Sequence, residues 1–294
     1  MYHRRFILLF ALCFALAQQL HAQIKVDMRI GRRLYIAYEP IMVTVAIANL
    51  SGHDITLTDA DAQKWFSFQI TTNDSRIVPP LDLDYHLTPL TIGAGQSVKR
   101  SLNLASLYGV QEFGTYHVKA SVYSTEMQKY FSSPEDEFEI TEGKLFWQQT
   151  VGVPAGVPGA GSFRTISLLT YQMMKDNMLY IRVEDKDAGL VYTTNQLGRL
   201  LTSFDPQIEL DKANQIHVLQ LIGPKSYIYS RIGLNGEWLG QLSYNAVMSK
   251  PVLKKRADGS VVVVGGQLDA PVVPAPGAPA APKLSDRPPG LPKS

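Results

Sequence analysis

A two-residue alternation of apolar and polar side chains runs through the first half of the chain and restricts its fold more than any other feature. It occurs from Val43 to Ala48, from Phe66 to Ile70 and from Tyr116 to Val122. Successive side chains of a strand point to opposite faces, so this period is typical of strands with one buried and one solvated face. Turn sequences such as Ser51-Gly52 and Asn73-Asp74 separate the stretches. They predict an antiparallel sandwich of roughly six to eight short strands over residues 23–145.

Two further motifs carry a resemblance to a known family. A glycine-bearing turn, Gly93-Ala94-Gly95, precedes one predicted strand, and Gly114-Thr115-Tyr116 opens the next. In this the region resembles bacterial immunoglobulin-like β-sandwich modules. The resemblance implies the sandwich fold and a tyrosine corner, in which the hydroxyl of Tyr116 would tie down a neighbouring backbone turn. It implies no activity, since this fold has many functions, and the cysteine pair of antibody-type domains is absent.

Residues 146–162 are rich in glycine and proline, which interrupt strands. We predict a linker here between two domains. Phe146 and Trp147, at its start, are expected to pack where the domains meet.

Residues 163–267 contain a weak internal repeat of 37 residues: Tyr180 corresponds to His217, and Tyr192 to Tyr229. The sequence from Asp211 through Asn214 to His217 resembles a sequence motif of bacterial β-propeller blades. This predicts an antiparallel β-meander, blade-like and packed on the first domain. A closed propeller takes at least four blades, so oligomerisation to complete one is the alternative. Asp258-Gly259 predicts a hairpin turn.

Both ends of the chain have their own composition. Arg4 and Arg5 precede an apolar run from Phe6 to Ala17, and Ala22 is a small residue at the expected cut. This predicts a secretory signal peptide over residues 1–22, and hence a periplasmic or secreted protein. The apolar run is too short for a membrane-spanning helix. Residues 268–294 are rich in proline and alanine, which predicts a disordered tail with polyproline II character.

Charge and cysteine content exclude several classes of function. Removing Arg4 and Arg5 from 28 basic residues leaves 26, against 26 acidic residues. A formal charge near zero gives no reason to expect nucleic acid as a partner. Cys13 is the only cysteine and lies in the predicted signal, after Leu12 rather than the small residue that a lipidation site needs. The mature chain is therefore expected to have no disulfide, cysteine-ligated metal or cysteine nucleophile.

The sequence has no compact catalytic motif. It contains neither a phosphate-binding loop nor a G-x-S-x-G elbow, and no histidines at zinc-binding spacing. His217 and Asp211 either form an acid–base pair, or His217 is hydrogen-bonded within the core and Asp211 caps a turn. Loop carboxylates such as Asp82 and Asp84 either bind calcium or lie in solvated turns. The basic cluster from Lys250 to Arg256 either contacts an acidic polymer or a lipid headgroup, or it protects a solvated strand edge. We predict no enzyme, no cofactor and no metal.

The remaining signal is the number of large aromatic side chains, which proteins use in recognition. We predict an exported binding or scaffold protein of the cell envelope whose partner is an envelope protein. The candidate binding residues are Phe146, Trp147, His217 and Trp238. The alternatives are a periplasmic protein that binds or processes carbohydrate, with Trp238 as a contact, and a protease inhibitor.

Overall fold

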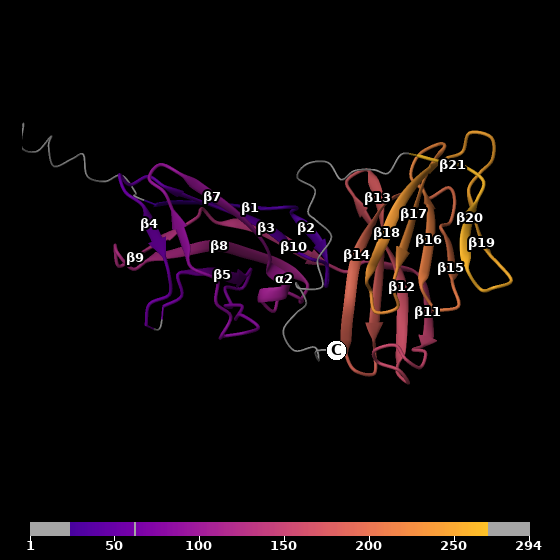
Figure 1. The fold of residues 1–294 in the computed structure, drawn as a ribbon, viewed down its shortest axis with the longest axis horizontal. Helices are drawn as coiled ribbons and strands as arrows, with labels where there is room; N and C mark the ends of the chain where they lie inside the picture. Colours follow the sequence, from indigo (N-terminus) through magenta and orange to yellow (C-terminus); the bar gives the residue numbers. More distant parts are fainter. Residues whose placement is uncertain (1–23, 62, 270–294) are drawn as a thin grey trace, which may run out of the picture. The chain divides into compact units, whose positions relative to one another are not determined.

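The computed structural model describes residues 24–61 and 63–269, which are almost entirely β-structure (Figure 1). The all-β prediction is confirmed. The helix α2 (Leu104–Leu107) is a single turn, and no helix of the described residues is long and apolar enough to cross a bilayer. The predicted signal peptide and all but the first two residues of the predicted tail lie outside the described residues.

The chain divides into two compact units that interleave along the sequence. Unit 1 takes its described residues from Met1–Arg33, Met42–Leu102 and Thr115–Phe138. Unit 2 takes them from Leu34–Ile41, Asn103–Gly114 and Glu139–Ser294. The division therefore differs from the sequential domains expected from the sequence, because two short segments of the first half belong to unit 2.

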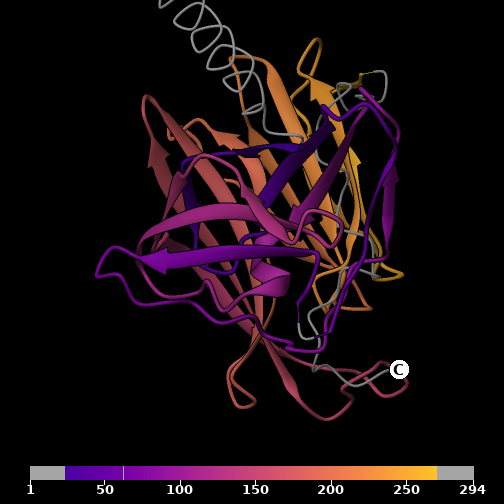
Figure 2. The ribbon, with the colours of Figure 1, turned by 90° about the vertical axis from the view of Figure 1, so that its left-hand side faces the viewer.

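Unit 1 consists mainly of three sets of antiparallel strands, seen from two directions in Figures 1 and 2. The first sheet has the order β1-β3-β7, and in the second β8 pairs with both β5 and β9, while β4 pairs with β6. The strands are β1 (Ile24–Ile30), β3 (Met42–Asn49), β4 (Ile55–Leu57), β5 (Phe66–Thr72), β6 (Leu90–Ile92), β7 (Ser97–Asn103), β8 (Gly114–Ser124) and β9 (Lys129–Ser132).

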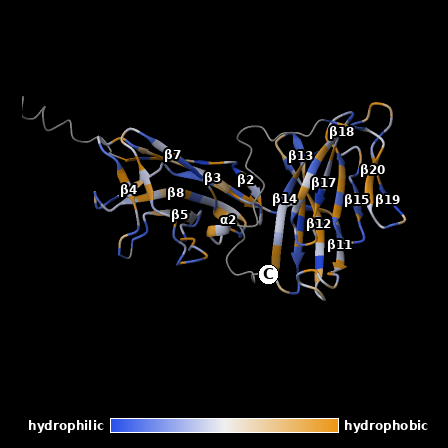
Figure 3. Cartoon of the chain, viewed as in Figure 1, coloured by the Kyte–Doolittle hydropathy of each residue, from blue (hydrophilic) through white to orange (hydrophobic). Residues whose placement is uncertain are grey.

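The alternation in the sequence sets which face of these strands is buried. In β3, Val43, Val45 and Ile47 are buried, while the polar residue Thr44 between them is exposed. Apolar and polar residues follow one another along the strands in Figure 3. Tyr116 of β8 is buried and stacks on Phe138, with ring centroids 5.2 Å apart. Its predicted tyrosine corner stays a prediction, and so does the resemblance to immunoglobulin-like modules.

Unit 2 contains two larger antiparallel meanders. One sheet has the order β11-β12-β13-β14, and the other has the order β15-β16-β17-β18-β21. The strands of the first are β11 (Lys144–Gly152), β12 (Phe163–Met173), β13 (Asp176–Asp185) and β14 (Leu190–Leu200). Those of the second are β15 (Gln207–Leu210), β16 (Ile216–Leu221), β17 (Ser226–Ile232), β18 (Trp238–Asn245) and β21 (Gln267–Leu268).

The core of unit 2 lies between these two sheets. Leu168, Leu179 and Ile181 of the β11–β14 sheet pack in one buried cluster with Ile216 and Val218 of the β15–β18 sheet. The opposite face of β16 and β17 is covered by the hairpin β19 (Val252–Lys255) and β20 (Val261–Val264), which contributes to a second cluster. The predicted Asp258-Gly259 turn is confirmed, and the φ of +82° at Gly259 explains the glycine.

Two features of unit 2 depart from the sequence expectations or were absent from them, and a third agrees with them. β11 occupies the first part of the expected linker, and turns follow it up to Ser162. β2 (Leu34–Ile36) pairs in parallel with the end of β10 (Asp136–Thr141), through Glu139–Thr141. The repeat-related residues Tyr180 and His217 lie on corresponding strands, β13 and β16, and both are buried. The propeller-blade resemblance itself stays a prediction.

A buried arginine joins the two meanders. Arg164 of β12 is 1% exposed, and its Nη1 lies 3.0 Å from Oδ2 of Asp185 on β13. Its Nε donates to Oδ1 of Asn235, in the turn between β17 and β18, at 3.0 Å, and its guanidinium lies 4.4 Å from the ring centre of Tyr192. A buried charge is tolerated where it is paired and hydrogen-bonded, and here both conditions hold.

Candidate functional site

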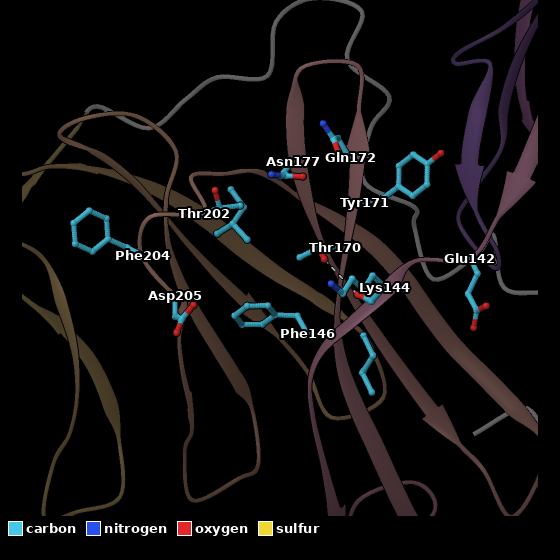
Figure 4. A pocket seen from close by; sticks show the side chains of 12 residues that line it. Glu142, Lys144, Phe146, Thr170, Tyr171, Gln172, Asn177, Thr202, Phe204 and Asp205 are labelled. Atoms are coloured by element: carbon cyan, nitrogen blue, oxygen red, sulfur yellow. Dashed lines mark hydrogen bonds between the residues drawn. The ribbon is translucent and has the colours of Figure 1, made fainter.

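A pocket of about 540 Å³ opens in unit 2 at the end of the β11–β14 sheet. The four strands β11 to β14 and the segment that leads from β14 to β15 line it, which brings together residues from four places in the chain (Figure 4). The lining residues are Glu142, Lys144, Leu145, Phe146, Thr170, Tyr171, Gln172, Asn177, Leu200, Thr202, Phe204 and Asp205.

A β-bulge places Phe146 in this pocket. Leu145 pairs with Leu169, and Trp147 pairs with the next residue of β12, Leu168, so Phe146 is an extra residue without a partner in the register. A bulge redirects a side chain and bends the strand locally. The ring of Phe146, which is 40% exposed, points toward Asp205 in Figure 4. One of the predicted binding residues therefore lines the pocket.

Trp147, the neighbour of Phe146, has a different role. It packs against the buried cluster between the two sheets and is half-buried. The bulge therefore separates two aromatic residues that the sequence treats as one pair: Phe146 lines the pocket and Trp147 supports the core.

Phe204 is a second aromatic residue at the pocket, and sequence reasoning missed it. It lies in the segment between β14 and β15, is 54% exposed, and its ring centre is 5.0 Å from Nζ of Lys250. In Figure 4 its ring points away from Phe146, so the two rings are set apart along the hollow. An aromatic residue in an otherwise polar turn, between Ser203 and Asp205, is the only signal the sequence offers.

Polar side chains supply the rest of the lining. Asn177 and Gln172 lie opposite each other in the β12–β13 hairpin, and Thr202 and Asp205 lie in the segment that carries Phe204. These groups offer amide, hydroxyl and carboxylate partners close to an apolar ring. Such a mixture of apolar surface and a few polar groups is typical of ligand sites.

His217 lies inside the β15–β18 sheet rather than in the pocket. It is 4% exposed, its Nδ1 lies 2.7 Å from the hydroxyl of Tyr229, and its Nε2 lies 3.5 Å from Oδ2 of Asp211. Burial lowers the pKa of His217 below its ordinary value, against the opposing effect of Asp211. This arrangement matches the buried hydrogen-bonded alternative, since no substrate can reach a side chain so enclosed.

Trp238 is also part of the packing of unit 2. It lies at the start of β18, pairs with Ile232 and packs against the cluster between the sheets. The structure therefore brings none of the other three predicted binding residues into the pocket with Phe146.

The carboxylates considered for calcium have partners within the protein. Asp59 accepts a hydrogen bond from the backbone of Trp65 at 2.7 Å and lies 2.5 Å from Nδ1 of His86. Asp82 accepts one from the backbone of Asp84 at 2.8 Å. Within residues 24–61 and 63–269, no group of three or more histidine, cysteine, aspartate or glutamate side chains is placed to hold a metal ion.

Comparisons with known proteins give no family for this chain. No protein-family model and no curated protein matches it. Among solved structures, the crystal structure of Spo0M, a sporulation control protein from Bacillus subtilis, matches with 12% sequence identity and a TM-score of 0.29. The match covers 62% of this chain and 92% of that chain.

Proposed function

We propose that this protein is a non-enzymatic binding protein of the bacterial cell envelope, and that it holds an extended polypeptide segment of a partner protein in the pocket of unit 2. The observation that carries the proposal is the bulged residue Phe146, whose exposed ring faces a hollow that continues to a second exposed ring, Phe204. Exposed aromatic anchors in a pocket dominate the binding energy of many protein interfaces.

The separation of the two rings favours an elongated ligand. Phe146 comes from β11 and Phe204 from the segment between β14 and β15, and the two rings face different parts of the hollow (Figure 4). A chain several residues long can place one apolar side chain on each ring, and the polar groups of Thr202 and Asn177 can then meet its backbone. β11 is also the terminal strand of its sheet, so its outer edge offers main-chain groups beside Phe146.

Export and an envelope partner are retained in the proposal from the sequence. They rest on the signal-like sequence of residues 1–22. Binding is favoured over catalysis because the His217–Asp211 pair, the acid–base candidate of the sequence, is buried away from the pocket.

The test is selection of binding peptides from a displayed library of short random sequences on the purified chain. We expect the selected peptides to be rich in proline or apolar residues. Fluorescence anisotropy should show that the peptides bind F146S and F204S at least roughly 10-fold more weakly than the unchanged protein, since each change removes an aromatic anchor.

The matched control is Phe163→Ser. Phe163 lies in the same sheet, at the other end of β12, and is also highly exposed at 54%. F163S should bind the peptides as the unchanged protein does. Equal loss in all three variants, or selected peptides that bind F146S and F204S normally, would contradict the proposal. Binding on a glycan array that W238A abolishes would instead favour the carbohydrate alternative.

A further inference from the structure

We propose that the chain carries its own ligand for the pocket: the proline-rich segment 270–294 docks onto Phe146 and Phe204 of the same molecule and competes with the partner. This inference rests on the proposed function, because it assigns an internal regulator to the same pocket. Three observations carry it: where the described chain ends, how far the segment reaches, and how its prolines are spaced.

The described chain ends on the side of unit 2 that carries the pocket. Asp269, the last described residue, accepts two hydrogen bonds from Nδ2 of Asn245, at 2.7 and 2.8 Å, and its backbone donates to Ser243. β21 is therefore fixed to the end of β18, and the segment starts from a defined point.

A ladder of strand pairs connects that point to the pocket. Just beyond Leu200 of the pocket, the backbone of Leu201 donates to Leu221 at 2.9 Å, at the end of β16. Leu221 lies opposite Tyr227 of β17, and Ser226 lies opposite Asn245 of β18, which pairs with Gln267 of β21. Three strand spacings of about 4.8 Å separate β16 from β21, a distance on the order of 15 Å.

Phe204 provides a second, shorter connection. Its ring lies 5.0 Å from Nζ of Lys250. A Cβ placed on Gly265 would be only 2.7 Å from the carbonyl oxygen of Lys250, so the bend between β20 and β21 passes directly beside this lysine.

The sequence of the segment suits an aromatic surface. Pro276, Pro279 and Pro282 are three residues apart. A polyproline II helix has about three residues per turn, so such prolines fall along one face of it. Grooves lined by aromatic rings bind this kind of ligand, because its backbone is already extended and loses little entropy on binding.

The reach of the segment exceeds the spacing between β16 and β21. Pro276 lies seven residues beyond Asp269, which spans about 22 Å at about 3.1 Å per residue. The first proline of the series can therefore reach the pocket without strain. A tethered ligand has an effective concentration in the millimolar range, so even weak docking would compete with a partner.

The experiment is photo-crosslinking in the full chain. The photoreactive residue p-benzoylphenylalanine replaces Thr202, which lines the pocket between the two rings, and a second variant carries it at Phe163 as the matched control. We expect mass spectrometry to find crosslinks from position 202 to residues 270–294 and none from position 163. P276A/P279A/P282A and F146S/F204S should each reduce the crosslink several-fold.

Mixing isotope-labelled and unlabelled protein separates docking within one molecule from docking between two. Crosslinks that join labelled to unlabelled chains would overturn the intramolecular proposal in favour of a second copy. An absent crosslink, or one with equal yield in the proline variant, would overturn it entirely.

Peptide binding distinguishes this failure from failure of the proposed function. With a docked tail, the selected peptides should bind P276A/P279A/P282A several-fold more tightly than the unchanged chain. Selected peptides that depend on Phe146 but bind both proteins equally would leave the proposed function standing and overturn the docked tail. If position 202 crosslinks to residues 270–294 but the library yields no binding peptide, even when P276A/P279A/P282A is the target, the proposed function alone is contradicted.

Discussion

At the scale of single residues, Arg164 and His217 are buried side chains that can carry a charge, and both depend on specific polar partners. Arg164 satisfies Asp185 and Asn235, which are 21 and 71 residues away in the sequence. His217 is held by Tyr229 and faces Asp211. The sequence suggests His217 and Asp211 together, but the contacts of Arg164 and the bond from His217 to Tyr229 have no fixed spacing, so only the folded chain reveals them.

Replacing Arg164 should destabilise the protein severely. R164M leaves the carboxylate of Asp185 buried with its charge unpaired, and removal of one partner of a buried ion pair typically costs about 3–5 kcal/mol. R164M/D185N should recover much of this loss, since no uncompensated charge remains. Urea unfolding of the two variants and of D185N gives the coupling free energy. If R164M/D185N is as unstable as R164M, packing and not charge is the main contribution of Arg164 to the free energy of unfolding.

His217 should make the protein less stable in mildly acidic solution. Burial lowers its pKa in the folded protein below its ordinary 6.5, opposed by Asp211 and Glu209 and aided by Arg231. The unfolded chain therefore takes up a proton first, and the free energy of unfolding falls as the pH drops from about 6.5 toward the folded pKa.

The measurement is the free energy of unfolding of H217Q and of the unchanged chain between about pH 7 and about pH 5. H217Q should lose less stability across this interval. An unchanged slope in H217Q would show that other groups cause the acid sensitivity.

At the scale of elements, the bulge in β11 places the side chain of Phe146 in the pocket at the edge of its sheet. The register continues from Leu145–Leu169 directly to Trp147–Leu168, so Phe146 can be removed without changing either pair. Deletion of Phe146 should keep the fold, shift the melting temperature by no more than about 2–4 °C, and weaken binding of the selected peptides roughly 10-fold. Calorimetry and anisotropy measure the two effects. A deletion that unfolds the protein would mean that the bulge serves the core instead.

The sequence predicts strands better than it predicts this site. Period-two alternation identified stretches such as Val43 to Ala48 because each has one buried and one solvated face. The glycines and prolines after Gly152 suggested a linker from residue 146 onward, yet Trp147 and Val151 pack on the core and keep that stretch in the sheet. Phe146 was identified because it is large and aromatic, but the direction of its side chain depends on a register shift that no local sequence pattern encodes. Phe204 stands alone in a turn. The sequence left open whether His217 is buried or accessible, because a buried and an exposed polar residue look the same in a sequence.

At the scale of the whole molecule, the described residues form two all-β units, and the proposed site lies within unit 2. Its lining residues all belong to Glu139–Ser294, including the anchors Phe146 and Phe204. Binding should therefore be a property of unit 2 and leave unit 1 unaffected. Exposed apolar side chains of unit 1, such as Leu83 and Tyr85, are the control surface, where we expect no peptide to bind.

The most direct measurement is a titration of the isotope-labelled chain with a selected peptide, followed by NMR of the backbone amides. We expect the largest chemical-shift changes on residues 144–147, 170–177 and 200–205, and we expect F146S/F204S to remove them. Changes centred on the loop around Leu83, or changes at the pocket that survive in F146S/F204S, would contradict this expectation.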